Sequence, residues 1–503
     1  MPLTFENIQA LLPLLITVFT TVFVMLAIAI RRNHWWNATV TVVGLNLALL
    51  STGYVFFAKV LFPESFTGPS GMLLQTITPL FVVDGFSLFF TGLILIAALG
   101  ASTLTHAYVE TSRRNREEIY LLITIATAGG IVLTMAHHMA SLFIGLEMMS
   151  VALYGMVAYT YDRTRSLEAN IKYMILSATA SAIMLFGIAL IYAEFGSLAF
   201  IDIGAKISAE PGLLVIVGGM MLIIGLLFKL SLAPFHLWTP DVYEGAPAPV
   251  GAFLATAAKV AVFAVLVRFV VIESPAVLRS STFAITLVAI ACLSMLVGNL
   301  LALKQNNIKR MLGYSSIAHF GYLLALVLLG GRDLGLEGFA VYLTIYVITA
   351  LAAFGVVTLM STARGDRDAD DLLDYRGLFW RRPFLASLFT LSLFSLAGIP
   401  LTAGFIGKLY VVIAGVSQGV VGWIALIFVV LGSAISIYFY LRTIVSMFLA
   451  SKNMQKFDAQ LHWGEQTGGI MVLISALLVL VIGIYPEPLI QIAHLSKLVW
   501  GVQ

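Results

Sequence analysis

The chain contains little charge and a single cysteine. Charged residues make up 11% of its 503 residues, against roughly 25% in ordinary soluble domains. The cysteine, Cys292, excludes an intramolecular disulfide and an iron–sulfur cluster held by several thiolates. The net charge of +3 is small and scattered along the chain, which argues against nucleic-acid binding. These shortages exclude an ordinary soluble globular protein.

Long apolar runs fill most of the sequence instead. Hydrophobic residues make up 60% of it and the mean hydropathy is +1.01. These values mean that the apolar residues are too numerous to belong to a single membrane anchor. The runs are continuous for about 20 residues, as in transmembrane helices, and do not alternate in polarity as β-barrel strands do. We therefore expect an all-α integral membrane protein with about fourteen transmembrane helices, of which the first is retained and not cleaved as a signal peptide. The predicted spans, numbered 1 to 14, are 8–30, 37–61, 80–104, 118–136, 139–160, 170–193, 212–245, 248–272, 281–303, 308–330, 336–360, 384–417, 420–448 and 468–493.

The basic residues predict the orientation. Loops after odd-numbered spans, together with their flanks, hold nineteen lysines and arginines, whereas the opposite side, which includes both termini, holds six. Positive charges concentrate on the cytoplasmic side of membrane proteins. The bias predicts that the chain crosses the bacterial inner membrane with both termini in the periplasm. The three remaining basic residues, Lys229, Lys259 and Lys408, fall inside spans.

Spans 7 and 12 are about half as long again as a membrane-crossing helix needs. Each carries a proline in its middle, Pro234 and Pro400, so each helix is expected to break there. The tripeptide Ser-Leu-Ala begins at residues 231 and 395, five spans apart, which predicts two inverted five-helix repeats made of spans 4–8 and 9–13. Paired broken helices in inverted repeats are typical of ion pathways in secondary transporters. The predicted units are 1–117 with three spans, 118–272 and 281–448 with one repeat each, and 449–503 with the last span.

Four charged residues lie deep within the predicted spans: Glu147, Lys229, Lys259 and Lys408. A charged side chain at the bilayer centre raises the free energy of membrane insertion by at least about 2.5 to 3.5 kcal/mol, so each of the four needs a functional or structural explanation. Desolvation disfavours a charged lysine and a nearby carboxylate favours it, so a lysine there can release and regain a proton. These residues suggest a proton relay, in which His319 of span 10 could link donors and acceptors.

Simpler roles exist for some of these side chains. Glu147 could be a satisfied helix-contact residue, and Lys408 could extend its ammonium to the membrane surface. His319 could be a satisfied interior residue, and His236, after the break of span 7, could either cap the broken helix or join the relay. Trp35 is expected, with its neighbour Trp36, to anchor a span end at the interface.

An acidic run follows span 11 and is mixed with arginines. Its charge pattern predicts a solvated cytoplasmic loop or a surface for a partner protein. No cluster with metal-ligand spacing or phosphate-binding glycine loop rises above chance. The run consists of Asp366, Asp368, Asp370, Asp371 and Asp374, with Arg364 and Arg367.

The stretch from Phe228 to Pro247, FKLSLAPFHLWTPDVYEGAP, followed by Lys259, closely resembles the antiporter-like membrane subunits of proton-pumping NADH-quinone oxidoreductase, respiratory complex I. The resemblance covers the whole chain at the level of fourteen spans. It implies that Glu147 and Lys229 form a coupled pair, that Lys259 connects, and that Lys408 is the terminal lysine. Lys408 and the chain end ten residues after span 14 favour the subunit N branch over its M and L siblings.

The resemblance also implies what surrounds the chain. NADH, FMN, iron–sulfur clusters and quinone are expected in partner subunits, with no cofactor or metal bound by this chain and no nucleic acid as a partner. The expected partners are other membrane-arm subunits and the lipid bilayer. The function implied is proton translocation coupled to quinone reduction, without redox chemistry in this chain. Two alternatives remain open, a subunit of a Mrp-type sodium/proton antiporter and a structural membrane scaffold.

Overall fold

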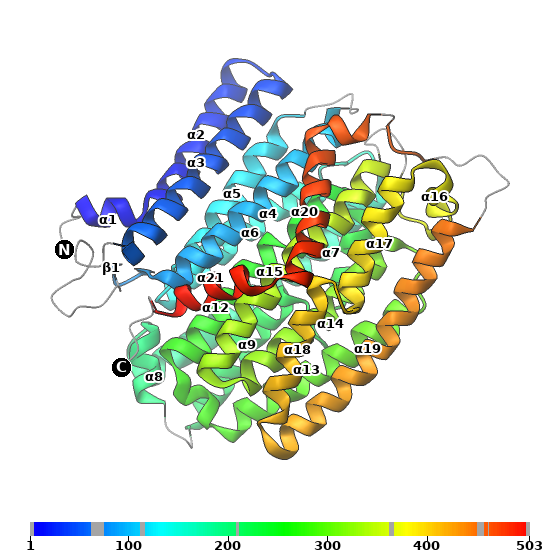
Figure 1. Ribbon diagram of the computed structural model, residues 1–503. Helices are drawn as coiled ribbons and strands as arrows, with labels where there is room; N and C mark the ends of the chain where they lie inside the picture. The colour runs from blue at the N-terminus through cyan, green and yellow to red at the C-terminus, as the bar shows by residue number, and fades with distance from the viewer. Residues whose placement is uncertain are drawn as a thin grey trace.

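The apolar runs form helices, because only helices satisfy their own backbone hydrogen bonds in a bilayer. The computed structural model describes residues 5–61, 75–110, 116–207, 211–361, 367–449, 457–460 and 462–498 (Figure 1). Its α-helices are α1 (Phe5–Ala10), α2 (Leu12–Ile30), α3 (His34–Leu61), α4 (Gly85–Glu110), α5 (Glu118–Thr134), α6 (Met139–Val157), α7 (Thr164–Phe195), α8 (Phe200–Lys206), α9 (Leu213–Leu230), α10 (Trp238–Gly245), α11 (Ala248–Ala255), α12 (Ala257–Val267), α13 (Ser281–Ala302), α14 (Ile308–Leu329), α15 (Gly331–Met360), α16 (Leu378–Arg381), α17 (Pro383–Ala397), α18 (Ala403–Val416), α19 (Gly419–Phe448), α20 (Thr467–Ile484) and α21 (Glu487–Leu498).

Short elements complete the described chain. The strands β1 (Gln75–Thr78) and β2 (Phe81–Val83) form an antiparallel hairpin that pairs Gln75 with Val83. A π-helical turn covers Arg268–Glu273 directly after α12. Single 3-10 turns cover Pro275–Arg279, Leu372–Tyr375 and Trp463–Glu465.

Twelve helices in the described part are long and apolar enough to cross a membrane, and α5, α17 and α18 are shorter apolar helices. The chain is therefore an all-α multi-pass membrane protein, which confirms the predicted fold class. The count of fourteen spans and the inverted repeat stay predictions.

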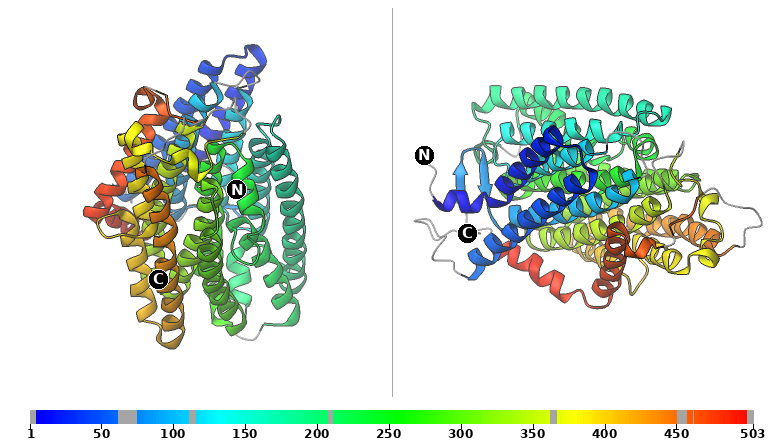
Figure 2. Two further views of the ribbon diagram at one scale, coloured as in Figure 1. Left: turned by 90° about the vertical axis from the view of Figure 1, so that its right-hand side faces the viewer. Right: turned by 90° about the horizontal axis from the view of Figure 1, so that it is seen from above.

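The bundle has a buried middle and an exposed rim. Nearly every residue of α12, α14 and α15 is buried, whereas most residues of α2 and α19 are at least partly exposed. Figure 1 shows α2 and α3 at one edge of the molecule and α19 at the opposite edge. The C-terminal helices α20 and α21, in red, lie on the outside of the bundle in both views of Figure 2. Helices α12 and α14, which carry Lys259 and His319, therefore belong to the most buried part of the bundle.

The two predicted helix breaks are confirmed. Helix α9 ends where Ser231 takes a left-handed conformation with φ 64°, and α17 ends where Gly398 does so with φ 80°. Polar groups freed by the breaks find side-chain partners: Ser294 Oγ accepts from Ala233 N at 2.9 Å, and Ser395 Oγ accepts from Gly404 N at 3.0 Å. These partners make irregular backbone tolerable inside a membrane protein.

A third interruption was not predicted. Span 8 is divided at Thr256, whose φ of −114° and ψ of −89° separate α11 from α12. The hydroxyl of Thr256 donates to Ala252 O at 2.6 Å, a local bond that competes with regular helix geometry. As a result, Lys229, Lys259 and Lys408, the three lysines of the predicted relay, each lie close to an interrupted helix.

Candidate functional site

Glu147 and Lys229 approach one face of α7 from two different helices. Glu147, in α6, accepts a hydrogen bond from Ser181 Oγ at 2.5 Å. Lys229, in the last turn of α9, donates from Nζ to Ser177 Oγ and Ser150 Oγ, both at 2.6 Å. Residues four apart on a helix lie one turn apart on the same face. Helix α7 thus brings the predicted pair to neighbouring turns.

The two charged groups are not in direct contact. No ion pair within 4.0 Å joins Glu147 to Lys229, both of which belong to the described residues. Lys229 is buried and its hydrogen-bond partners are hydroxyls. Tyr154 also donates to Ser177 Oγ at 2.7 Å. Each of the two groups is therefore held by a serine hydroxyl of α7 and not by the other charge.

Lys259 lies in the first turn of α12, at the buried centre of the bundle. Its side chain is 1% exposed, and Nζ donates to Ser316 Oγ of α14 at 2.5 Å. Nζ also lies 4.7 Å from the centre of the Phe320 ring, within the range of a cation–π contact. In the described part of the chain no carboxylate forms an ion pair with Lys259. The contacts of its ammonium are therefore one hydroxyl and the faces of two aromatic rings, Phe320 and, at 6.0 Å, Tyr243.

Helix α14 contacts both Lys259 and Lys408, the lysine that follows the second helix break. Ser316, His319 and Tyr322 follow at intervals of three residues, which places them along one side of α14. His319 Nδ1 and the hydroxyl of Tyr342 lie 2.9 Å apart. The Tyr322 ring lies 5.5 Å from Lys408 Nζ. His319 thus lies on α14 between Ser316, which contacts Lys259, and Tyr322, which contacts Lys408.

Lys408 lies in α18, directly after the break. It is buried, and Nζ donates to Ala397 O, the last carbonyl of α17, at 2.6 Å. A lysine that extended to the membrane surface would place its ammonium in water. The bond to Ala397 inside the break does not match that alternative.

His236 lies in the connection between α9 and α10, apart from the other predicted residues. It is buried, and its Nδ1 has no hydrogen-bond partner among the described residues. Its ring centre lies 6.5 Å from that of Tyr314. The structure does not bring His236 into contact with the buried lysines.

The prediction of a solvated loop after span 11 is wrong for most of its acidic run. Asp368, Asp370 and Asp374 are 1%, 3% and 7% exposed. Arg367 binds Asp370 at 3.0 Å and Asp374 at 2.6 Å, so the opposite charges pair with one another and fold inward. Arg364 and Asp366 lie outside the described residues.

Asp368 ties four distant parts of the chain together. Its Oδ1 accepts from Tyr108 of α4 at 2.7 Å and from Arg163, just before α7, at 2.8 Å. Its Oδ2 accepts from Lys309 of α14 at 2.8 Å and from Ala248 N, which begins α11, at 3.0 Å. Burial alone would raise the pKa of this carboxyl, but Lys309 and Arg163 lower the pKa to about 2. No local sequence signal could have found this cluster, because its members are up to 260 residues apart.

A second buried ion cluster lies directly after α12, at the other end of the interrupted helix whose first residue, Ala248, contacts Asp368. Arg268 binds Asp84 through two hydrogen bonds, at 2.7 and 2.9 Å, and lies 3.4 Å from Glu273. Glu273 in turn lies 2.7 Å from His137 Nδ1. Burial raises the pKa of Asp84, but Arg268 outweighs it and holds that pKa below its usual value. Sequence reasoning counted Arg268 among the six basic residues of the periplasmic side, and the structure shows that it is 1% exposed.

Comparisons with known proteins show what the chain is similar to. Residues 136–436 match the family described as NADH:quinone oxidoreductase/Mrp antiporter, TM. The chain is 53% identical to NADH-quinone oxidoreductase subunit N of Ectopseudomonas mendocina (strain ymp), over 99% of this chain and 98% of that protein. A chain of respiratory complex I from Thermus thermophilus with bound aureothin is 32% identical, with a TM-score of 0.79 over 95% of this chain and 98% of that one. A chain of the Mrp complex from Dietzia sp. DQ12-45-1b, with a TM-score of 0.81 over 98% and 97% of the two chains but 19% identity, shares the fold.

Proposed function

Since the chain belongs to the NADH:quinone oxidoreductase/Mrp antiporter family, as a membrane subunit of NADH-quinone oxidoreductase, we propose that it carries protons across the membrane. The proposed path runs from Glu147 to Lys229, then to Lys259, and through His319 to Lys408. His236 is not needed in this path.

One observation carries the proposal: three buried lysines are held by neutral oxygen atoms. The partners are serine hydroxyls for Lys229 and Lys259, and a backbone carbonyl for Lys408. A lysine paired with a buried carboxylate is fixed in its charged form, because its neutral form would leave an unpaired charge behind. A lysine held by neutral oxygens leaves no such charge when it loses its proton. These positions therefore suit groups that change protonation state.

The neighbouring hydroxyls suit the transfer itself. A serine hydroxyl accepts one hydrogen bond while it donates another, so it passes a proton on without holding a charge. Ser316 occupies such a position beside Lys259. His319 bonds with Tyr342 through Nδ1, and a histidine takes up and releases protons at its two ring nitrogens. In the proposed path Lys259 releases its proton toward Ser316, and the face of α14 carries it toward Lys408.

We place the chain in the bacterial inner membrane with both termini in the periplasm, which the bias of basic residues supports. The redox reaction belongs to partner subunits, which hold NADH, FMN, the iron–sulfur clusters and the quinone. Other subunits of the membrane arm adjoin this chain. Quinone reduction in the complex then drives the relay in this subunit.

Substitution of Lys259 by methionine tests the relay. Methionine keeps much of the length of the side chain and removes the proton that it carries. We expect the complex with Lys259→Met to assemble, as judged on a native gel, but to lose proton pumping and quinone-linked NADH oxidation by at least about tenfold. Proton uptake is measured in proteoliposomes with a pH-sensitive dye. Lys304→Met, at the exposed end of α13, is the matched control.

Two outcomes would overturn the proposal. Normal pumping by an assembled Lys259→Met complex would leave a structural scaffold as the role of this chain. Proton flux that requires sodium and persists without NADH oxidation would assign it to a sodium/proton antiporter.

A further inference from the structure

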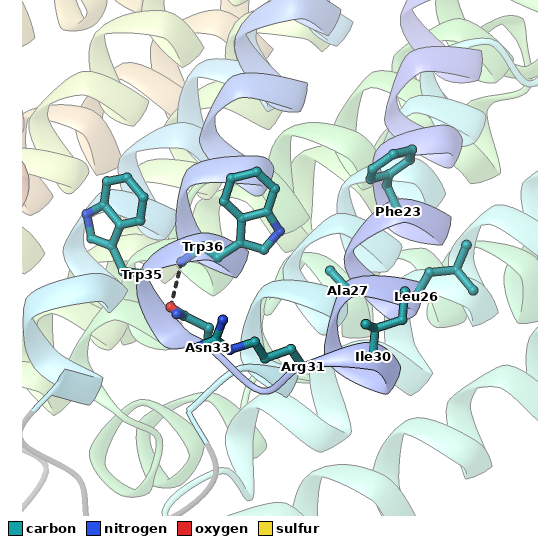
Figure 3. A pocket seen from close by; sticks show the side chains of 8 residues that line it. All are labelled: Phe23, Leu26, Ala27, Ile30, Arg31, Asn33, Trp35 and Trp36. Atoms are coloured by element: carbon teal, nitrogen blue, oxygen red, sulfur yellow. Dashed lines mark hydrogen bonds between the residues drawn. The ribbon is translucent and has the colours of Figure 1, made fainter.

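A hollow of about 490 Å³ lies outside the bundle, where α2 ends and α3 begins. Figure 3 shows Arg31 and Asn33 in the short connection, with apolar side chains on the preceding helix and two indole rings on the following one. The relay does not use this region. The hollow is lined by Phe23, Leu26, Ala27, Ile30, Arg31, Asn33, Trp35 and Trp36.

The wall of the hollow is apolar and uncovered. Phe23 is 65% exposed and Ile30 is 86% exposed. Trp35 and Trp36 are also exposed, and tryptophan is enriched at the level of the lipid headgroups. The hollow therefore extends from the apolar part of the bilayer to its surface.

Arg31 supplies one positive charge at the polar end. Its guanidinium has no hydrogen bond or ion pair with the described part of the chain. The adjacent Arg32 is already paired, at 2.8 Å, with Glu118. An arginine that has no partner in the described part of the chain and lies beside an apolar groove can donate to an anion, and its planar fork suits phosphate oxygens.

A second hollow in the same molecule provides a comparison. It measures about 610 Å³, lies between α13 and α19, and is lined by apolar residues together with Cys292. No charged side chain lines it. Lipid chains of any headgroup suit that second hollow, so a preference for anionic lipid is expected at the first one alone.

We propose that the hollow between α2 and α3 binds one anionic phospholipid. Its phosphate lies at Arg31, its acyl chain runs along Phe23 and Ile30, and the indole of Trp36 packs beside the glycerol region. Basic pockets between transmembrane helices are known to hold anionic headgroups. The occupant is a lipid because the hollow combines an apolar groove, a single unpaired cation and interfacial tryptophans, all at the end of a membrane span.

Photocrosslinking of the assembled complex tests this site. The complex is reconstituted in phosphatidylcholine vesicles that contain a trace of photoactivatable phosphatidylglycerol, or of photoactivatable phosphatidylcholine as the zwitterionic counterpart. Crosslinked peptides are mapped by mass spectrometry. We expect phosphatidylglycerol to label the segment from Phe23 to Trp36 about fivefold more than phosphatidylcholine does, since one basic residue near a membrane surface contributes about that factor.

Two variants separate the charge from the groove. Arg31→Gln should lower the labelling by phosphatidylglycerol to the level of phosphatidylcholine, whereas Lys304→Gln, a cation away from the hollow, should leave it unchanged. Ala27→Phe fills the groove and keeps the charge, and it should lower the labelling by both lipids.

Equal labelling by the two lipids in the wild type, or an undiminished preference for phosphatidylglycerol in Arg31→Gln, would refute the site. Crosslinks from this segment to another subunit in place of lipid would show that a protein covers the hollow.

Discussion

The buried cations of this protein fall into two groups that differ in their partners. At the two ends of the bundle, Arg163 and Lys309 bind Asp368, and Arg268 binds Asp84. In the middle, Lys229, Lys259 and Lys408 bind hydroxyls and a carbonyl. A buried charge with a buried counter-charge is fixed in place and in protonation state. The difference separates cations held by a buried counter-charge from cations held by neutral oxygens, and the second group is the one that we propose exchanges protons.

The comparison predicts that the end clusters support stability and that the central lysines support function. Asp368 should show the largest effect on stability. Asp368→Asn leaves Lys309 and Arg163 buried without a counter-charge, which should lower the free energy of unfolding by about 3 to 5 kcal/mol. Denaturant titration of the purified protein measures this loss. Glu465→Gln, at a carboxylate whose side chain is 82% exposed, should change the free energy of unfolding little. Wild-type stability of Asp368→Asn would erase the distinction between the two groups.

The same carboxylate should give the protein a defined acid sensitivity. Its pKa of about 2 in the folded chain lies below the value near 3.9 of an unfolded chain. Its contribution is therefore present above about pH 4 and is lost as the pH falls toward 2, and it amounts to about 2 to 3 kcal/mol. The stability difference between wild type and Asp368→Asn should be constant from about pH 5 to 8 and shrink below pH 4. A difference that does not change with pH would assign the loss to packing.

Arg268 should show a smaller effect when its charge is kept. Arg268→Lys retains the ion pair with Asp84 but loses one of its two parallel hydrogen bonds, because an ammonium cannot match the fork of a guanidinium. We expect a loss of about 1 to 3 kcal/mol in the free energy of unfolding, with proton pumping retained. Loss of pumping at normal stability would move this cluster into the transport path.

Lys408 should show the smallest effect on stability and a large effect on pumping. Lys408→Arg keeps the positive charge beside the Ala397 carbonyl and leaves no buried charge without its partner, so its effect on the free energy of unfolding should be smaller than that of the other two variants. A guanidinium does not lose its proton in proteins, so pumping and NADH oxidation should fall if Lys408 must become neutral. Proteoliposome assays measure both rates. Full activity in Lys408→Arg would remove this lysine from the path.

Much of the architecture could be predicted from the sequence, because bilayer physics acts on local composition. Apolar runs of the right length become helices, and Pro234 with Ser231, like Gly398 with Pro400, marks the places where two helices break. The break at Thr256 escaped prediction, because a threonine ends a helix in one setting and continues it in another.

The relay residues were identified in the sequence as charges that a bilayer does not tolerate without a reason. That reasoning could not say what each lysine contacts. Ser316 and Phe320 lie 57 and 61 residues from Lys259 in the chain, and only the packing of α14 against α12 brings them together. The same reasoning placed Asp368 and Asp374 in a solvated loop, because the partners that bury a run of charges cannot be recognised from the sequence.

The sequence by itself determined that the chain is a helical membrane protein, where two of its helices break, and which buried charges are unusual. The tertiary structure alone decided which buried cations have a carboxylate partner and which have only hydroxyl or carbonyl partners. The physical reason is that hydropathy and helix breaking depend on neighbours along the chain, whereas the protonation behaviour of a buried group depends on atoms within a few ångströms in space, and these come from distant segments.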